Sequence, residues 1–153
     1  MTKQATRSPI SPPMLLVLRS PRWQSQVQRL CEGLESWTHT HSLLSIEQAN
    51  SLVYSNPTAA LVVEIPDGFA SDPDPTVLQV ARLCNNPQRC PLFLLGDADA
   101  EPWSDIFREA GVAELCTSVL SFENFGLRLV RHLENHVRSE LTVEQTVVAR
   151  LPW

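Results

Sequence analysis

Short apolar runs alternate along this chain with longer segments in which apolar residues recur at helical spacing. The strongest runs are residues 14–18, 59–65 and 91–95, each followed by polar or turn-forming residues. A continuous apolar run of this length is typical of a strand that is covered on both faces, as in a parallel sheet. The alternation therefore predicts an α/β domain with right-handed crossovers and helices on both faces of a parallel sheet.

Two weaker strands complete the pattern, a polar one near residues 38–44 and a last one over 112–119. The helices are predicted from their starts and stops. Ser20 and Pro21 begin the first, Ser45 and Gln48 form a capping box for the second, and Asp74 is expected to cap a helix that starts at Pro75. The expected helices cover residues 21–37, 46–56, 75–85, 102–110 and 123–138. We therefore expect five strand-helix units, with Gly111 ending the fourth helix.

The ends of the chain differ from this pattern. Residues 1–13 contain three prolines among polar residues and are predicted to be a disordered tail. Residues 14–138 form the predicted domain, and 139–153 a C-terminal extension that is too apolar for an inert tail. Thr142 and Gln145 would cap a further short helix there, or the last helix would continue. Either would place apolar side chains against a partner, against a second copy of the chain, or back on the domain itself.

Charge and hydropathy exclude several classes of partner. The chain has 12 Lys and Arg against 17 Asp and Glu, a net charge of −5, without the basic cluster that binds nucleic acid. The longest apolar run, at residues 14–18, is far shorter than the ~20 residues that span a bilayer. It is also shorter than the core of a signal peptide. We therefore expect a cytoplasmic protein that binds neither nucleic acid nor membrane.

Neither the cysteines nor the histidines are spaced like a metal site. The four cysteines form no C-x-x-C pair and are interpreted as reduced core residues, with a Cys84–Cys90 redox pair as the alternative. His39 with His41, and His132 with His136, are each interpreted as exposed polar pairs rather than metal ligands. The glycine motifs of nucleotide-binding loops are absent. We therefore expect no metal and no cofactor.

One stretch resembles a known family. Glu109-Ala-Gly-Val-Ala-Glu-Leu-Cys-Thr-Ser-Val-Leu-Ser-Phe-Glu-Asn-Phe125 is similar, without a gap, to the E-A-G-A-D-D-Y-L-T-K-P-F-S-P-E-E-L pattern of response-regulator receiver domains. Residues 57–68 and 91–97 match the family more loosely. The resemblance implies a flavodoxin-like (βα)5 doubly wound fold. This is a three-layer sandwich around a parallel five-stranded sheet of order 2-1-3-4-5.

The resemblance also implies which positions would carry the family's phosphoryl transfer to aspartate. The acceptor maps onto Glu64, the phosphoryl-binding hydroxyl onto Gly96 and the lysine onto Ser118. Arg19 and Ser20 stand where the family has an acidic pair that holds Mg²⁺. Two further positions differ from the family, the proline that follows the lysine being Val119 and the switch aromatic Leu115.

No matched position keeps a residue able to play its part, which predicts a pseudo-receiver that is not phosphorylated. We therefore expect a non-catalytic, receiver-like signalling or regulatory protein-interaction module. Glu64 would either imitate a phosphorylated aspartate or simply be tolerated at a strand end. The alternative function is a metal-dependent enzyme, or a flavodoxin-like domain that binds a small ligand. It would use carboxylates at the ends of the third and fourth strands: Glu64, Asp67, Asp97 and Asp99.

A protein partner is expected on the usual output face of receivers, formed here by the segments 102–110, 112–119 and 123–138. The candidate contact residues are Trp103, Leu120, Phe122 and Arg131. Trp103 and Phe122 have an alternative role as ordinary core residues. A homodimer through the last helix or the C-terminal extension is also expected.

Overall fold

A single parallel sheet organises the chain in the computed structural model, which describes residues 12–33 and 39–149. Its strands lie in the order β2-β1-β3-β4-β5. They are β1 (Met14–Val17), β2 (Thr40–Leu43), β3 (Ala60–Glu64), β4 (Leu92–Leu95) and β5 (Glu114–Cys116). The parallel pairing and the order 2-1-3-4-5 confirm the predicted flavodoxin-like fold.

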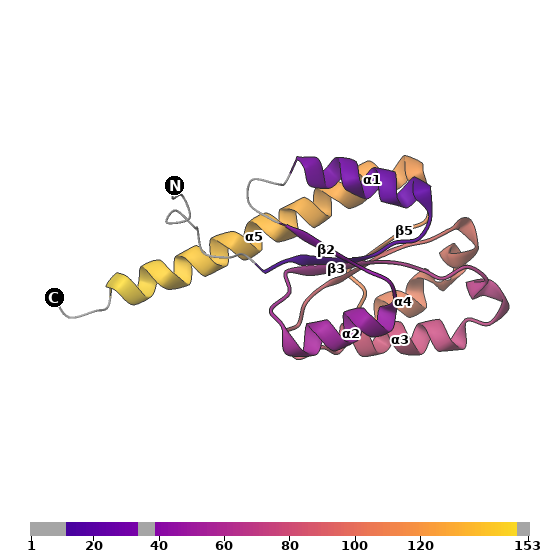
Figure 1. The fold of residues 1–153 in the computed structure, drawn as a ribbon, viewed down its shortest axis with the longest axis horizontal. Coiled ribbons are helices and arrows are strands. Elements are labelled where there is room, and N and C mark those ends of the chain that lie inside the picture. The colour runs from indigo at the N-terminus through magenta and orange to yellow at the C-terminus, as the bar shows by residue number, and fades with distance from the viewer. Residues whose placement is uncertain (1–11, 34–38, 150–153) are drawn as a thin grey trace.

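Helices cover both faces of this sheet (Figure 1). The α-helices are α1 (Pro21–Glu32), α2 (Ile46–Ser55), α3 (Asp74–Cys84), α4 (Ser104–Ala110) and α5 (Phe122–Ala149). The described residues also contain three short 3₁₀ helices, each between a strand and the next α-helix: η2 (Phe69–Ser71), η3 (Ala98–Trp103) and η4 (Val119–Ser121). In Figure 1, α1 and α5 lie on one face, whereas α2, α3 and α4 lie on the other. The molecule is therefore a three-layer sandwich.

The strands bury side chains on both faces, as their continuous apolar runs predicted. In β3, Leu61 and Val63 pack on the side of α2, α3 and α4, whereas Ala60 and Val62 pack toward α1 and α5. The central strands β1, β3 and β4 are buried along their whole length. Strand β2 lies at the edge, and its side chains are mostly exposed, including His41. Its edge position explains why this strand is polar in sequence.

The ends of the helices test the predicted caps. The Ser45 hydroxyl accepts a hydrogen bond from the Gln48 N–H at 3.2 Å, and the Gln48 side chain accepts one from the Leu44 N–H at 2.8 Å. Gly111 has a φ of 112°, the left-handed conformation expected of a helix stop. The cap predicted at Asp74 is wrong, because Asp74 is already the first residue of α3 and Pro73 precedes it without a side-chain cap.

The predicted helix over 102–110 is only partly correct. Residues 98–103 form η3, and α4 begins at Ser104. The short α4 buries Phe107 completely but leaves 42% of Ile106 exposed, although helical spacing puts both on the apolar side of this segment. One helix of seven residues against the sheet can turn only one or two side chains fully inward, so the spacing overestimated the buried stripe.

The last strand and the last helix have different bounds from those predicted. The strand ends at Cys116, because the Ser118 hydroxyl accepts a hydrogen bond from the Leu120 N–H at 3.2 Å and turns the chain into η4. Helix α5 continues without a break to Ala149, so the last helix does not end near 138. Of the two structures considered for 139–153, the helix continues. The division of 14–138 from 139–153 remains a prediction.

Other predictions meet the limits of the described residues. Of the predicted tail over 1–13, residues 1–11 lie outside them, whereas the Pro13 carbonyl accepts a hydrogen bond from the Ala59 N–H at 2.9 Å. The first helix, predicted over 21–37, is shorter, because α1 ends at Glu32 with Gly33 as its C-cap; residues 34–37 lie outside the described part. Within the described residues, no helix is both long and apolar enough to cross a membrane.

Candidate functional site

The carboxyl edge of the sheet gathers the residues that the sequence singled out. Glu64 is the last residue of β3, Arg19 and Ser20 follow β1, and Gly96 follows β4. Ser118 follows β5. Parallel strands end at the same edge, which is where open α/β sheets bind ligands.

Glu64 is buried at this edge, with 6% of its surface exposed. Its Oε1 accepts hydrogen bonds from the backbone N–H groups of Arg19 at 2.7 Å and Ser20 at 2.8 Å. Helix α1 begins at the next residue, Pro21, and has neither a side-chain cap on Ser20 nor an acidic residue in its first turn. The free N–H groups at a helix start attract negative charge. Glu64, at the end of β3, therefore caps the start of α1.

This arrangement stabilises the charged form of Glu64. Burial by itself would raise the carboxyl pKa. The hydrogen bonds from the backbone N–H groups of Arg19 and Ser20, together with the charge of Arg19, lower it by more than burial raises it, so the pKa lies below its ordinary value. Glu64 is therefore a carboxylate whose charge is already matched by its own surroundings.

Two arginines surround the capped carboxylate. The Arg19 guanidinium donates to the Ile65 carbonyl at 3.1 Å and lies 3.9 Å from an Asp67 carboxylate oxygen. The Arg22 guanidinium donates to the Gly96 carbonyl at 3.2 Å, forms an ion pair with Asp97, and lies 4.9 Å from the centre of the Trp23 ring. At this edge each guanidinium group thus lies against an aspartate, so Asp67 and Asp97 balance the charges of Arg19 and Arg22.

The four carboxylates proposed for a metal site are not gathered into one. Asp67 and Asp97 face arginines, Glu64 caps α1, and Asp99 is exposed on η3. No group of three or more potential metal ligands occurs among the described residues.

Gly96 and Ser118 have local structural roles. A Cβ at Gly96 would lie 3.1 Å from Ile65 Cδ1, so a larger residue there would require that side chain to shift. The Ser118 hydroxyl holds the Leu120 N–H in η4. Neither residue offers a free group aimed at Glu64.

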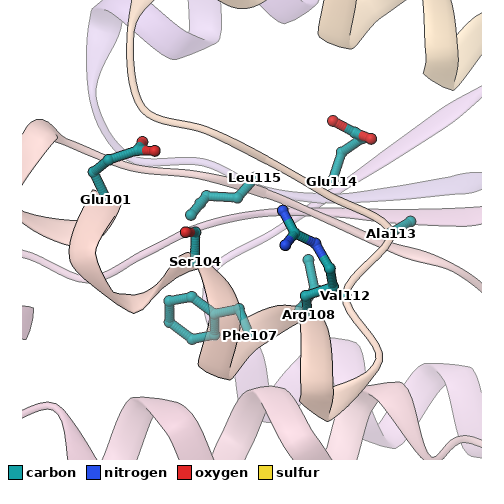
Figure 2. Close-up of a pocket in the computed structure, with 8 residues that line it drawn as sticks. All are labelled: Glu101, Ser104, Phe107, Arg108, Val112, Ala113, Glu114 and Leu115. Atoms are coloured by element: carbon teal, nitrogen blue, oxygen red, sulfur yellow. The ribbon is translucent and has the colours of Figure 1, made fainter.

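A hollow lies between α4 and β5, and Glu64 is not among the residues that line it (Figure 2). Phe107, Val112 and Leu115 line its inner part, and the charged groups of Glu101, Arg108 and Glu114 stand around it. Its volume is about 120 Å³, well below the several hundred Å³ of most small-molecule sites. It is therefore a surface feature of the face formed by α4, β5 and α5 rather than a ligand pocket.

The candidate contact residues differ in accessibility. Leu120 is 95% exposed, and Arg131 is exposed on α5. Trp103 is half-buried with its ring edge-on to Phe69, the ring centres 5.5 Å apart. Phe122 is buried against Trp23 and Phe125, so its core role, and not a docking role, agrees with the structure.

Sequence reasoning missed two features of this surface. The ion pair of Arg22 with Asp97 joins residues 75 apart, and no local pattern indicates it. The exposed Leu127 on α5 was also missed, although its position off the buried stripe of that helix was visible in the spacing.

The buried cysteines agree with the core interpretation. All four are free thiols, and Cys90 and Cys116 are buried. Burial raises the pKa of Cys84 to about 11 and that of Cys90 to about 12. His39 and His41 are exposed at the sheet edge, whereas His132 is half-buried near the Ala59 carbonyl. The side chain of His136 lies outside the described residues.

Comparison with known proteins identifies the fold. No family model matches the chain, and no curated protein matches it. Solved structures do. A response regulator from Thermotoga maritima aligns with a TM-score of 0.63 and 10% identity, over 82% of this chain and 99% of that one. A CheY-like protein, tadZ, from Pseudomonas aeruginosa aligns with a TM-score of 0.57 and 16% identity, over 80% and 99%.

A third similar structure is the receiver domain of the sensor histidine kinase PA1611 from Pseudomonas aeruginosa, which was solved with a magnesium ion in its active-site cleft. It aligns with a TM-score of 0.59 and 13% identity, over 81% of this chain and 98% of that one. The chain therefore has the fold of response-regulator receiver domains.

Proposed function

We propose that this chain is a receiver-like regulatory module that acts through protein contacts and does not accept a phosphoryl group. The observation that carries the proposal is the cap on α1: the Glu64 carboxylate is buried and bonded to the Arg19 and Ser20 N–H groups. Under the resemblance, this is the position of the phosphoryl acceptor.

Phosphoryl transfer to a carboxylate needs an accessible oxygen and cations placed to neutralise the transferred group. In this chain one oxygen of Glu64 is engaged by two N–H groups. Arg19 and Ser20 stand where an acidic pair would attract Mg²⁺, and the guanidinium groups of Arg19 and Arg22 already hold the nearby carboxylates of Asp67 and Asp97. The same ion pairs disfavour a metal-dependent enzyme at this edge.

The alternative role of Glu64 as a standing mimic of phosphoaspartate is also disfavoured. Its negative charge is matched by the backbone N–H groups of Arg19 and Ser20, directly before α1, and by the Arg19 side chain. A carboxylate that is neutralised inside the edge presents little charge to a partner. We assign Glu64 a structural role in place of the role of phosphoryl acceptor.

The output surface in this proposal is the face formed by α4, β5 and α5. Leu120, 95% exposed in η4, is the apolar residue on that face that nothing in the described chain covers. Arg131 is exposed on α5, and the charged rim of the hollow in Figure 2 lies between α4 and β5. This combination suits a protein partner better than a small molecule.

The test is chemical phosphorylation. Wild type and Glu64→Asp are incubated with acetyl phosphate and Mg²⁺, beside an active receiver domain as positive control, and intact masses are measured. We expect no phosphoryl adduct on either form, since restoring the aspartate does not restore the metal site. A hydrolysable adduct on wild type would refute the proposal.

A further inference from the structure

A groove runs between α1 and α5. It has a volume of about 260 Å³. Leu30 of α1 and Phe122 and Val130 of α5 give it apolar walls, and Gly126 leaves room between them. Leu127 lines the same groove and is 55% exposed. An open apolar groove beside an exposed leucine is a hole next to a knob.

The knob begins a heptad pattern in the sequence of α5. From Leu127, steps of three and four residues reach Val130, Glu134, Val137, Leu141, Glu144 and Val148. Such 3-4 spacing is that of the a and d positions of a coiled coil. Five of these seven positions are apolar, and the two exceptions are glutamates. The pattern starts in the groove and runs to the end of the helix.

The second half of α5 runs past the end of the sheet (Figure 1). The helix has 28 residues, about 42 Å at 1.5 Å per residue, and its C-terminal half extends clear of the sheet in Figure 1. This half is rich in β-branched residues, which are poor helix formers: Thr142, Val143, Thr146, Val147 and Val148. A helical segment of about a dozen residues is only marginally stable alone in water. Its helical structure therefore calls for a partner.

We propose that the partner is a second copy of this chain, joined through α5 as a parallel two-stranded coiled coil. In such a dimer a knob at position a enters a hole made by four residues of the facing helix. For Leu127 these are residues 123, 126, 127 and 130 of the other copy. All four line the groove. The chain thus carries the knob and its matching hole on one helix, as a two-fold interface requires.

Charged side chains also lie beside the groove. Arg29 of α1 and Glu123 of α5 line it from its two sides, are exposed, and have no ion pair in the described part of the chain. In this register Glu123 is the d position before Leu127 and lies at the seam, with Arg29 on the other side of the groove. A partner that covers the groove must therefore carry charges as well as apolar side chains, as the same stretch of a second copy does.

Glu134 and Glu144 at seam positions weaken the same dimer, because like charges face each other across the two-fold axis. They predict a reversible association rather than an obligate one. Replacing one of them with leucine should therefore strengthen the association, which tests the seam without disrupting it. The dimer is independent of phosphorylation, so it stands whether or not the proposed function is correct.

Sedimentation equilibrium over concentrations up to the millimolar range measures the association of the full chain. We expect a reversible dimer of wild type, a dissociation constant raised about tenfold or more in Leu127→Asp, and one lowered about tenfold or more in Glu134→Leu. Leu120→Asp is the matched control, since Leu120 is also an exposed leucine but lies in η4. Circular dichroism checks that each variant is folded.

A cysteine at position 134 distinguishes parallel from antiparallel association. In a parallel dimer in register, Glu134→Cys places the two thiols opposite each other and yields a disulfide-linked dimer under mild oxidation, above the background of wild type. Truncation after residue 138 should shift the chain toward monomer with its melting temperature little changed.

The proposal is overturned if wild type stays monomeric throughout this range. It is equally overturned if Leu120→Asp dissociates the dimer and Leu127→Asp does not, or if Glu134→Cys gives no cross-link above background. A monomer whose melting temperature falls on truncation would show instead that 139–153 pack on their own domain.

Discussion

The carboxylate of Glu64 accepts a hydrogen bond from the backbone N–H of Ser20, 2.8 Å away and 44 residues earlier in the chain. This bond ties the end of β3 to the start of α1. It makes Glu64 part of the scaffold at the carboxyl edge of the sheet.

Replacing Glu64 with glutamine should destabilise the fold by about 1–2 kcal/mol. The amide is the same size but loses the charge that matches the start of α1, and a hydrogen bond to a charged group is worth more than one to a neutral group. Urea denaturation measures the free energy of unfolding. Glu109→Gln, on the exposed surface of α4, is the control and should change it by less than about 0.5 kcal/mol. Equal losses of unfolding free energy in the two variants would contradict a structural role for Glu64.

The stability of wild type should fall in acid partly through Glu64. Its pKa is lower in the folded chain than the ordinary 4.5, so the unfolded chain takes up the proton first as pH decreases. The contribution is present above the unfolded pKa and is lost as pH falls through the folded pKa. Denaturation curves from pH 7 down to about pH 3 should therefore be flatter for Glu64→Gln than for wild type. Parallel curves would contradict the lowered pKa.

Changing Leu120 to aspartate, with Arg131→Glu, should leave the domain as stable as before, within about 0.5 kcal/mol, because both side chains are exposed. The same pair should abolish capture of a protein partner in a pull-down. Tyr54→Asp on α2 is the matched control, since Tyr54 is 52% exposed on the other face of the sheet. If only the Tyr54 change abolished capture of the partner, docking would take place on the other side of the sheet from the one proposed.

A Gly126→Ala substitution should have opposite effects on folding and on association. The added methyl would lie 3.4 Å from Leu30 Cδ1, an ordinary contact, and alanine favours a helix interior over glycine by about 1 kcal/mol. Thermal unfolding should therefore show a more stable monomer, while sedimentation shows a weaker dimer because the hole is partly filled. Gly111→Ala is the contrast. With a φ of 112° and Cys84 Cβ at 3.1 Å, it should destabilise the fold.

The thiols of Cys84 and Cys90 should react slowly with an alkylating reagent at pH 8. Burial raises their pKa values to about 11 and about 12, and each unit above the ordinary pKa reduces the reactive thiolate about tenfold. Mass spectrometry with peptide mapping would count the modified sites before and after unfolding. Rapid modification of Cys90 in the native protein would contradict its buried position.

Much of the fold was predictable because it depends on local patterns. The apolar runs located the three buried strands β1, β3 and β4 to within one residue at each end. The Ser45 and Gln48 capping box was correct because both partners lie within one helical turn. Ser118 shortened the last strand through a bond to Leu120, a local contact that strand propensity did not indicate.

The candidate site was predictable in part. Sequence placed Glu64, Gly96 and Ser118 at one edge of the sheet, because the carboxyl ends of parallel strands must meet there. It did not predict what these residues contact. The partners of Arg22, at Gly96 and Asp97, are 74 and 75 residues away, so only the folded sheet brings them within reach.

The sequence by itself determined the order of strands and helices along the chain and which residue types stand at the matched positions Glu64, Gly96 and Ser118, since both are carried by residue identity and local spacing. Only the tertiary structure decided that Glu64 caps α1, that Phe122 is core while Leu120 and Leu127 are exposed, and that α5 extends past the sheet. The physical reason is that hydrogen-bond partners and burial are set by which distant segments pack together. A periodic apolar stripe states which side of a helix prefers burial, but the neighbouring elements determine how much of that side is covered.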